Sequence, residues 1–438
     1  MLINGIIRSF NPIGQGAFVT EHFYRNGKEY ATVIFDAGFL KTATKGGEKR
    51  AKRVVQSVLA KEVPISAIFI SHLDEDHVGL VPYILREYHD QVKHIVLPRF
   101  SQEVVFAYYF WYKINYINRA KGKINWSRNL AQLITEIARK LGYVRGDEGR
   151  PLNQERGPNW YFIRSDEDER QPSFRVDNRD LIDLDSGGLG RIADEPSGIV
   201  FDLAVQSCQW HFVPYHRDDL RGKHKAKRFW EQIIDKYKDC FKHESYSPDQ
   251  PFFSGDHAAL EKLAELSKCV LRKKGGYKEL ARIYKSAWGD RNVDSMVVVS
   301  FPSSDCSVLP CRPIDFWSFL SHLIGSKYNH PSLMSILKPG AIYTGDSNAA
   351  ELPSQILLGS SSISKNIGSV QVPHHGSASS WDGKLATGDA TLYFASYGSV
   401  NTYGHPAPNV VRDIVLNFKI PLFYNEYSMP YMQVYSFE

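Results

Sequence analysis

Apolar residues come in short runs along the first hundred residues, and turns containing Asn or Gly separate several of these runs. The runs are rich in β-forming residues, whereas two longer segments repeat apolar residues at helical spacing. The predicted strands are Ile3–Phe10, Ala17–Phe23, Tyr30–Asp36, Ala67–Ser71 and His94–Leu97, and the predicted helices are Glu48–Glu62 and Leu80–Tyr88. Strands that alternate with helices are typical of an α/β domain.

The pattern changes between about Phe100 and Arg291, where helical periodicity dominates. The elements predicted there are the helices Leu130–Leu141, Lys225–Phe241, His257–Leu271 and Tyr277–Trp288 and the strands Ile199–Gln206 and Trp210–Pro214. The segment Asn153–Asp185 is polar and charged, and it includes the acidic run Asp166–Glu169. We therefore predict that residues 101–290 form a large, mostly helical insertion.

Short buried strands return after Ser295. The predicted strands are Met296–Phe301, Ala341–Thr344, Val370–Val372 and Leu392–Tyr397, and the predicted helices are Phe316–Ile324 and Val410–Phe418. The simplest organisation is one α/β domain in two halves, residues 1–100 and 291–438, which the insertion interrupts.

Composition limits the class of protein. Of the 438 residues, 43% are hydrophobic, so the chain can bury a large core and global disorder is not expected. The net charge of +5 tolerates a polyanionic partner without requiring one. The five cysteines form no CxxC pair, and their odd number indicates reduced thiols rather than a disulfide framework. We find no signal peptide and no membrane helix, and we expect a cytoplasmic protein.

The sequence SHLDEDHVG, which follows the predicted strand Ala67–Ser71, is the most informative part of the chain. It contains the potential metal ligands His72, Asp74, Asp76 and His77. Imidazole and carboxylate suit divalent ions such as zinc and manganese, and alternate loop residues can serve two neighbouring ions. The alternative is a charged loop whose aspartates cap the next helix, but capping does not account for the histidines.

Further strand ends carry similar chemistry. These are Asp36 in FDAG, Asp346 in TGDS, His374 and His375 in VPHHGS, and His405 in NTYGHP. Ligands brought from several strand ends to one rim are the expected layout of a catalytic metal site on a sheet. We expect Asp36 to orient another group rather than bind metal, and a structural hydrogen bond is the alternative for His405.

In this order, the segments GQG, FDAG, SHLDEDHVG, TGDS, VPHHGS and NTYGHPAP resemble the metallo-β-lactamase fold. The similar subgroup is the soluble hydrolase domain of the DNA-uptake protein ComEC, which carries segments such as HPDADHIGG, LLTGD, HHGS and NRYGHP. The resemblance covers residues 1–98 and 293–438. It implies a four-layered αββα sandwich and a hydrolase that uses two divalent ions.

The resemblance also implies roles for individual residues. The implied metal ligands are His72, Asp74, Asp76, His77, Asp346 and His374, and the implied catalytic residues are Asp76, His375 and His405. Asp346 would bridge the two ions, and Asp76 would orient a nucleophilic hydroxide for displacement at phosphorus. The imidazole of the histidine pair that does not bind metal, together with His405, would contact the phosphate or protonate the leaving group. Asp74, where many fold members have His, shifts preference from zinc toward manganese or magnesium.

The chain departs from the family pattern at some positions. Ala17 follows the GQG sequence, where the subgroup usually has an acidic residue. The fold's usual extra histidine between the first cluster and the bridging aspartate is not obvious. His211 and His216 are candidates for this ligand, and a structural role is the favoured alternative for both.

The insertion offers two further signals. The basic stretches Arg217–Arg228 and Arg272–Lys274 could neutralise the phosphates of a nucleic acid or form a solvated helix face. The aromatic residues between Phe106 and Tyr116 could stack on bases, but packing into a core is the favoured interpretation.

We therefore expect a metal-dependent phosphodiester hydrolase with DNA as the favoured substrate, whose insertion selects the substrate or a protein partner. One alternative is hydrolysis of a small substrate, such as a cyclic nucleotide or another phosphodiester. Another is a sensor or adaptor subunit of a bacterial defence system. Hydrolysis of β-lactams is disfavoured because such an enzyme would carry a signal peptide.

Overall fold

The computed structural model describes residues 4–119, 126–144, 157–165, 181–186, 191–196, 198–205, 208–216, 219–241, 259–288, 295–303, 306, 308–310, 338–352 and 366–437. The chain divides into two compact units. Unit 1 comprises Met1–Pro98, Arg156–His216 and Ser295–Glu438, and unit 2 comprises Arg99–Glu155 and Arg217–Asp294. None of the described helices has the length and hydrophobicity that a membrane crossing requires.

The predicted insertion, residues 101–290, is split between the two units, although we expected it to form one separate part. Residues 101–290 do not form one block, because Arg156–His216 belongs to unit 1 and supplies strands to both of its sheets. The short apolar strand Asn159–Arg164 lies inside Asn153–Asp185, where the surrounding charged residues hid it from the sequence pattern. Only the helical parts on either side of Arg156–His216 form the separate unit.

One sheet of unit 1 has nine strands among the described residues, in the order β12-β17-β1-β2-β3-β4-β5-β6-β8. Their bounds are β1 (Gly5–Phe10), β2 (Val19–Arg25), β3 (Lys28–Phe35), β4 (Ile65–Phe69), β5 (His94–Pro98), β6 (Asn159–Arg164), β8 (Ile192–Pro196), β12 (Val308–Pro310) and β17 (Tyr431–Phe437). Pairing is antiparallel from β12 to β3 and parallel from β3 to β8.

The other sheet has eight strands in the described part of the chain, in the order β16-β15-β14-β13-β11-β10-β9-β7. Their bounds are β7 (Leu181–Asp183), β9 (Val200–Val205), β10 (Cys208–Tyr215), β11 (Val297–Pro302), β13 (Gly340–Tyr343), β14 (Ile367–Gln371), β15 (Leu392–Ser396) and β16 (Ile420–Tyr424). The strands β13 to β16 are parallel, and β9, β10, β11 and β13 pair antiparallel.

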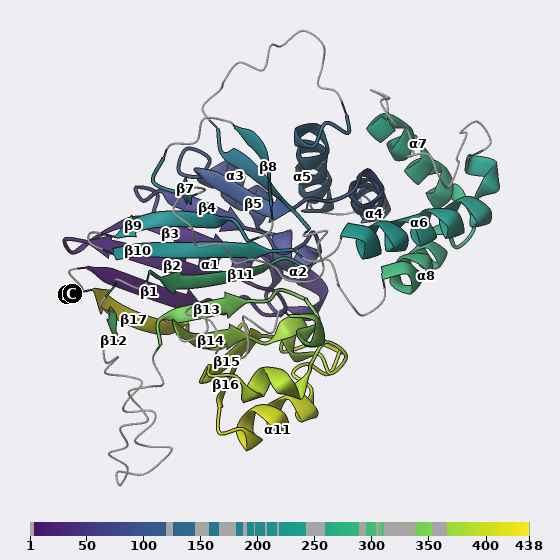
Figure 1. The fold of residues 1–438 in the computed structure, drawn as a ribbon. Helices are drawn as coiled ribbons and strands as arrows, with labels where there is room; N and C mark the ends of the chain where they lie inside the picture. Colours follow the sequence, from purple (N-terminus) through teal and green to yellow (C-terminus); the bar gives the residue numbers. More distant parts are fainter. Residues whose placement is uncertain are drawn as a thin grey trace. The chain divides into compact units, whose positions relative to one another are not determined.

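The two sheets face each other across one apolar core (Figure 1). Phe35 of β3 and Tyr343 of β13 stack there with ring centroids 3.6 Å apart. Every second residue of a strand points into this core, and the residues between point outward. Outward-facing Tyr393 packs with Val410 and Ile414 of α11 (Pro408–Leu416).

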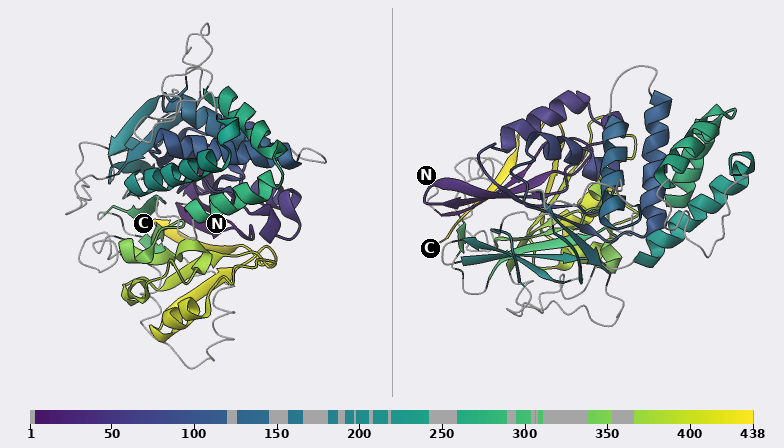
Figure 2. Two further views of the ribbon diagram at one scale, coloured as in Figure 1. Left: turned by 90° about the vertical axis from the view of Figure 1, so that its right-hand side faces the viewer. Right: turned by 90° about the horizontal axis from the view of Figure 1, so that it is seen from above.

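The outer side of the nine-stranded sheet is covered by α1 (Gly47–Val58) and α3 (Val81–Glu87), the purple helices in the right view of Figure 2. The outward residues Ile34 and Ile68 are fully buried there. Unit 1 is therefore an α/β sandwich of two mixed sheets.

Unit 2 consists of helices in its described part. They are α4 (Gln102–Arg119), α5 (Trp126–Lys140), α6 (Asp219–Lys236), α7 (Ala259–Arg272) and α8 (Gly276–Trp288). The aromatic residues of α4 mostly face inward: Phe106 and Phe110 are fully buried, and the Phe110 ring lies 5.3 Å from that of Trp230. The packing interpretation of this aromatic stretch is therefore confirmed.

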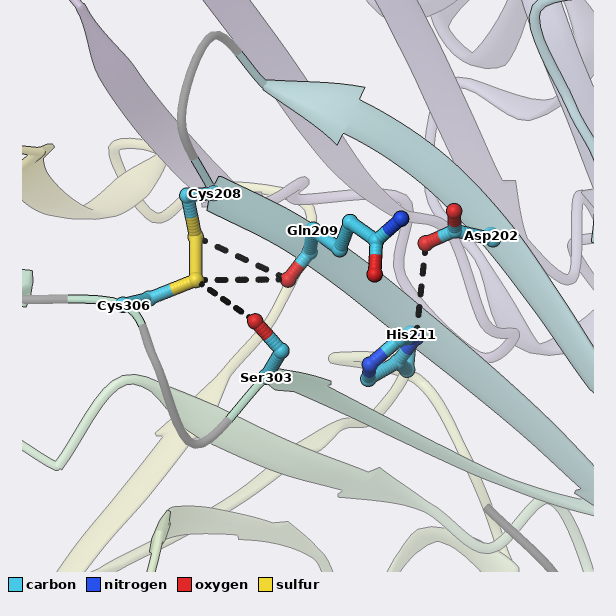
Figure 3. Close-up of a disulfide and its surroundings, with 6 residues drawn as sticks. All are labelled: Asp202, Cys208, Gln209, His211, Ser303 and Cys306. Atoms are coloured by element: carbon cyan, nitrogen blue, oxygen red, sulfur yellow. Dashed lines mark hydrogen bonds and ion pairs between the residues drawn. A yellow bond between two sulfur atoms is a disulfide. The ribbon is translucent and has the colours of Figure 1, made fainter. Parts of the chain in front are cut away.

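The expectation of reduced thiols is wrong. Cys208 and Cys306 form a disulfide in unit 1 (Figure 3), and Cys240 and Cys269 form another in unit 2. The partners are 98 and 29 residues apart in sequence, so their proximity follows from the fold and leaves no spacing signal. Disulfides are typical of oxidising compartments, and the expected cytoplasmic location stays a prediction.

Most predicted strands and helices end within a few residues of the observed ones. The strands β6, β7, β8, β12, β16 and β17 were not predicted. The predicted helix Phe316–Ile324 and the acidic run Asp166–Glu169 lie outside the described residues.

Candidate metal centre

The predicted site residues lie on loops that follow the carboxyl ends of parallel strands in the two sheets. Asp36 follows β3, His72 follows β4, Asp346 follows β13, the pair His374 and His375 follows β14, and His405 follows β15. Asp74 directly precedes the short helix α2 (Glu75–Val78), and Asp76 and His77 lie within it. Strand ends from both halves of the chain therefore meet at one edge of the sandwich.

The carboxylate of Asp346 is buried at the centre of this cluster. Its Oδ1 lies 3.0 Å from His77 Nε2 and 4.0 Å from His375 Nε2. Its Oδ2 lies 3.7 Å from His72 Nε2 and 3.5 Å from His374 Nε2. Each oxygen of one carboxylate thus faces a different pair of imidazoles, which is the arrangement expected of a residue that bridges two cations.

The two aspartates of SHLDEDHVG, Asp74 and Asp76, lie on opposite sides of Asp346. Asp76 Oδ2 is 3.4 Å from His375 Nε2, and Asp74 Oδ2 is 3.7 Å from His72 Nε2. Two groups have all their ligand atoms within 4.8 Å of one another: Asp76, His77 and His375, and His72, His77 and Asp346.

Backbone contacts fix the position of Asp76 and His77. Ala37 N donates to His77 O at 2.8 Å, and Ala17 N donates to Asp76 O at 2.9 Å. A Cβ on Gly38 would lie 2.3 Å from His77 N, so only glycine fits in FDAG at this position. The loop that carries GQG therefore contributes a backbone N–H through Ala17, for which no acidic side chain is needed.

Hydrogen bonds at Nδ1 orient the rings of His77 and His375. His77 Nδ1 lies 2.8 Å from Asp36 Oδ2, and His375 Nδ1 lies 3.0 Å from the carbonyl oxygen of Ser396. Because these oxygens only accept, each Nδ1 carries the proton, and in the neutral ring Nε2 has a lone pair. Both Nε2 atoms are buried and have no hydrogen-bond partner among the described residues.

Hydroxyl groups support the other two imidazoles. His72 Nδ1 lies 3.0 Å from Ser71 Oγ and 3.1 Å from Ser295 Oγ, and Ser295 Oγ also accepts from the backbone N–H of Asp346. His374 Nδ1 lies 3.2 Å from Ser380 Oγ. Partners of this kind hold metal-binding imidazoles in one orientation.

The electrostatics of the cluster favour added positive charge. Burial raises the pKa of Asp76, but the imidazoles of His375 and His77 outweigh it and lower that pKa to about 2. Burial also raises the pKa of Asp346, yet His374 and His77 hold it well below its ordinary value. The pKa of His77 is lowered by burial and raised more strongly by its two facing carboxylates, so it ends well above the ordinary value.

The histidine pair has a strained backbone. His374 and His375 have φ angles of 49° and 55°, in the left-handed region that residues with side chains rarely adopt. Each such residue costs on the order of 1–3 kcal/mol. A hydrogen bond of 3.0 Å from His374 N to Gly345 O holds the turn against the loop of Asp346. The turn directs both rings toward Asp346.

These observations fit a divalent metal centre. The carboxylates of Asp36 and Asp346 raise the pKa of His77, so its ring keeps a proton. A divalent cation can replace that proton between His77 Nε2 and Asp346 Oδ1, and the donor set of imidazole and carboxylate is one that zinc and manganese accept.

The structure gathers the predicted ligands His72, Asp74, Asp76, His77, Asp346 and His374 around one point. It differs from the prediction at the histidine pair, because His375 as well as His374 faces Asp346. The reason is the left-handed turn, which the sequence did not show. The roles of these residues as metal ligands remain predictions.

The candidate extra ligands are not in the two groups of ligand atoms. His211 lies on β10 opposite Asp202 of β9, and its Nδ1 is 3.3 Å from Asp202 Oδ1. His216 is buried just after β10.

The supporting residues around the centre were largely missed. Asp36 was expected to orient another group, and its contact with His77 shows which group this is. Ser295 carried no recognisable signal, because a single serine before a strand is common.

We compared the chain with models of known protein families and with curated proteins, and neither comparison found a match.

Proposed function

We propose that this protein is a metal-dependent phosphodiester hydrolase with the metallo-β-lactamase fold and that it cleaves nucleic acid, with DNA favoured. The observation that carries the proposal is the placement of Asp346, whose two oxygens face two separate pairs of imidazoles. The sandwich of two mixed sheets and the order of the sequence motifs support the fold assignment.

Two divalent cations, zinc or manganese, would be held on the two sides of Asp346. One side offers Asp76, His77 and His375, and the other offers His72, Asp74 and His374. Bound there, the cations would supply Lewis-acid stabilisation of a phosphoryl group and lower the pKa of a water molecule.

The chain's own residues would then orient the reactants. Asp76 is ionised and can accept a hydrogen bond from the attacking water. The ring of His405 lies 5.5 Å from that of His374, and its Nδ1 is buried without a hydrogen-bond partner among the described residues. Burial lowers the pKa of His405 to about 4, so the ring is neutral at pH 7 and can donate one N–H to a phosphate or leaving-group oxygen.

Unit 2 supplies the argument for a polyanionic substrate. Lys223 and Arg228 of α6 are exposed. Exposed cations can bind nucleic acid through its phosphates.

The test is cleavage of end-labelled single- and double-stranded DNA with added manganese. We expect cutting by the wild-type protein and at least a hundredfold loss in Asp76→Asn and in a His77→Ala variant, each measured together with bound metal. His89→Ala, which removes an exposed histidine, is the matched control and should cut normally.

The outcomes separate the alternatives. Bound metal without DNA cleavage would reject DNA as a sufficient substrate and direct the search to small phosphodiesters or to a required partner. No bound metal in a folded protein would reject the metal centre itself and favour the sensor or adaptor interpretation.

A further inference from the structure

Tyr403 lies at the outer end of a row of rings that begins at the candidate metal centre. The His374 and His405 ring centroids are 5.5 Å apart, and those of His405 and Tyr403 are 5.8 Å apart with an interplanar angle of 31°. His374 Nε2 in turn lies 3.5 Å from Asp346 Oδ2. Tyr403 is 58% exposed, so an aromatic side chain is open to solvent beside the site.

The loop that presents Tyr403 is held by its own hydrogen bonds. Asn401 Oδ1 accepts from the backbone N–H groups of Tyr403 at 3.2 Å and His405 at 3.4 Å. Asn401 Nδ2 donates to the carbonyl oxygen of Gly398 at 2.6 Å. One amide side chain therefore ties both ends of the loop together.

Two other segments anchor the start of this loop. Gln15 Oε1 accepts from Gly398 N at 3.2 Å. The carboxylate of Glu426 accepts from Ser399 N at 3.0 Å, from Ser399 Oγ at 2.6 Å and from Lys45 N at 2.8 Å. The exposed ring thus stands on a backbone that is already ordered, so little entropy is lost when a ligand covers it.

We propose that Tyr403 stacks on a nucleobase adjacent to the scissile phosphodiester, which makes nucleotides rather than aliphatic phosphodiesters the substrate class. This inference rests on the proposed function. A rigid exposed aromatic residue is the side chain that recognition sites use to gain contact area at low entropic cost. Every base has a π face, so stacking selects nucleotides without selecting a sequence.

The experiment compares kcat/KM on oligo(dT) and on an oligomer of the same length made of abasic sites. We expect Tyr403→Ala to lower kcat/KM on oligo(dT) about 5- to 150-fold, the range for loss of one base–aromatic stack, and to leave the abasic oligomer within about twofold. Tyr403→Phe, which keeps the ring, should retain most of the activity on oligo(dT).

Phe418→Ala is the matched control. Phe418 is 95% exposed and precedes β16, which runs parallel to β15. It therefore lies at the amino end of the parallel strands, whereas the candidate metal centre lies at their carboxyl ends. Loss of this aromatic side chain should change neither substrate.

A second measurement keeps the inference independent of turnover. Binding of phosphorothioate oligo(dT) and of its abasic counterpart is followed by fluorescence anisotropy with the metal-loaded protein. Weaker binding of oligo(dT) alone by Tyr403→Ala would support stacking even if neither oligomer is hydrolysed, in which case only the proposed hydrolysis fails. An equal effect of Tyr403→Ala on both oligomers, or no effect on either, would overturn the role of Tyr403.

Discussion

Two buried clusters of charged side chains lie in unit 1, and they differ in how their polar atoms meet. Arg8 of β1 and Glu21 of β2 are directly opposite in the antiparallel pair, and both are fully buried. At the candidate metal centre His72, His77, Asp346 and His375 are also buried. Burial alone therefore does not distinguish a structural polar cluster from a functional one.

In the first cluster every donor meets an acceptor. Arg8 Nη2 lies 2.7 Å from Glu21 Oε1, and Arg8 also donates to Tyr343 OH at 2.9 Å and to Gln433 Oε1 at 2.9 Å. Glu21 in turn accepts from Ser300 Oγ at 2.8 Å. Because Tyr343 and Ser300 belong to the other sheet, this network joins the two sheets and needs no ligand.

In the second cluster an imidazole that is oriented at Nδ1 faces a carboxylate with its Nε2. His77 Nδ1 donates to Asp36, its Nε2 lies 3.0 Å from Asp346 Oδ1, and these carboxylates raise its pKa, so the ring holds a proton that a cation can replace. His375 repeats the pattern, with its Nδ1 bonded to Ser396 O. The difference shows what marks a ligand site. Hydrogen bonds from surrounding residues orient the imidazoles and carboxylates, but these groups converge on one point, whereas in the first cluster each donor meets its own acceptor.

Breaking the paired network should have the largest effect on stability. Glu21→Ala leaves Arg8 buried without its counter-charge, and we expect the free energy of unfolding to fall by about 3–5 kcal/mol. Urea denaturation followed by circular dichroism measures this change. The double variant Arg8→Met, Glu21→Leu should recover part of the loss, and a loss below about 1 kcal/mol in the single variant would contradict the structural role.

Adding metal should stabilise the second cluster by a smaller amount. At a free Zn²⁺ or Mn²⁺ concentration of a hundred times Kd, binding to the folded protein alone adds about 2.7 kcal/mol to the free energy of unfolding. Asp346→Asn should remove this gain, because it replaces the bridging carboxylate. In EDTA the variant should be less stable than the wild type, because it loses the carboxylate charge that His374 and His77 stabilise in the folded protein. Thermal unfolding with and without metal measures both.

Asp202→Asn is the matched control for the metal experiment. Asp202 also lies beside a buried imidazole, that of His211 at 3.3 Å, but it belongs to neither group of potential ligands in the described residues. It should keep the full gain on metal addition. An equal loss of the gain in both variants would mean that the effect does not come from the centre around Asp346.

The sequence predicted the candidate centre better than its surroundings. His72 to His77 lie within one loop after an apolar run, and strand-end motifs supplied Asp346 and the histidine pair, so local order along the chain was informative. The direction of His375 was not predictable, because it follows from left-handed backbone at two consecutive histidines. The alternation of apolar residues likewise located most of the strands, whereas β6 was hidden by its charged neighbours.

The paired network around Arg8 was not predicted at all. Arg8 and Glu21 lie on strands whose register sets them opposite each other, and Tyr343 reaches them from a strand more than 300 residues away. The two disulfides were missed for the same reason. Contacts that depend on how two sheets stack leave no pattern of spacing in the chain.

The smallest predicted effect concerns a buried imidazole that belongs neither to the Arg8–Glu21 network nor to the candidate metal centre. His94 of β5 is fully buried, and its Nδ1 accepts from Asn159 Nδ2 at 3.2 Å. Burial lowers its pKa from the usual 6.5 to about 4. Between these values the unfolded chain binds a proton that the folded protein does not, so stability is complete above about pH 6.5 and falls as the pH drops toward 4. We expect a loss of about 2 kcal/mol between pH 7 and 5.

Urea denaturation of the wild type and of His94→Gln at both pH values, in EDTA, measures this contribution as a difference. The variant should lose about 2 kcal/mol less than the wild type on acidification, since glutamine does not titrate. Equal losses would show that His94 is protonated in the folded protein as readily as in the unfolded chain. Such a result would contradict the contrast between His94, where burial dominates and lowers the pKa, and His77, whose facing carboxylates raise it.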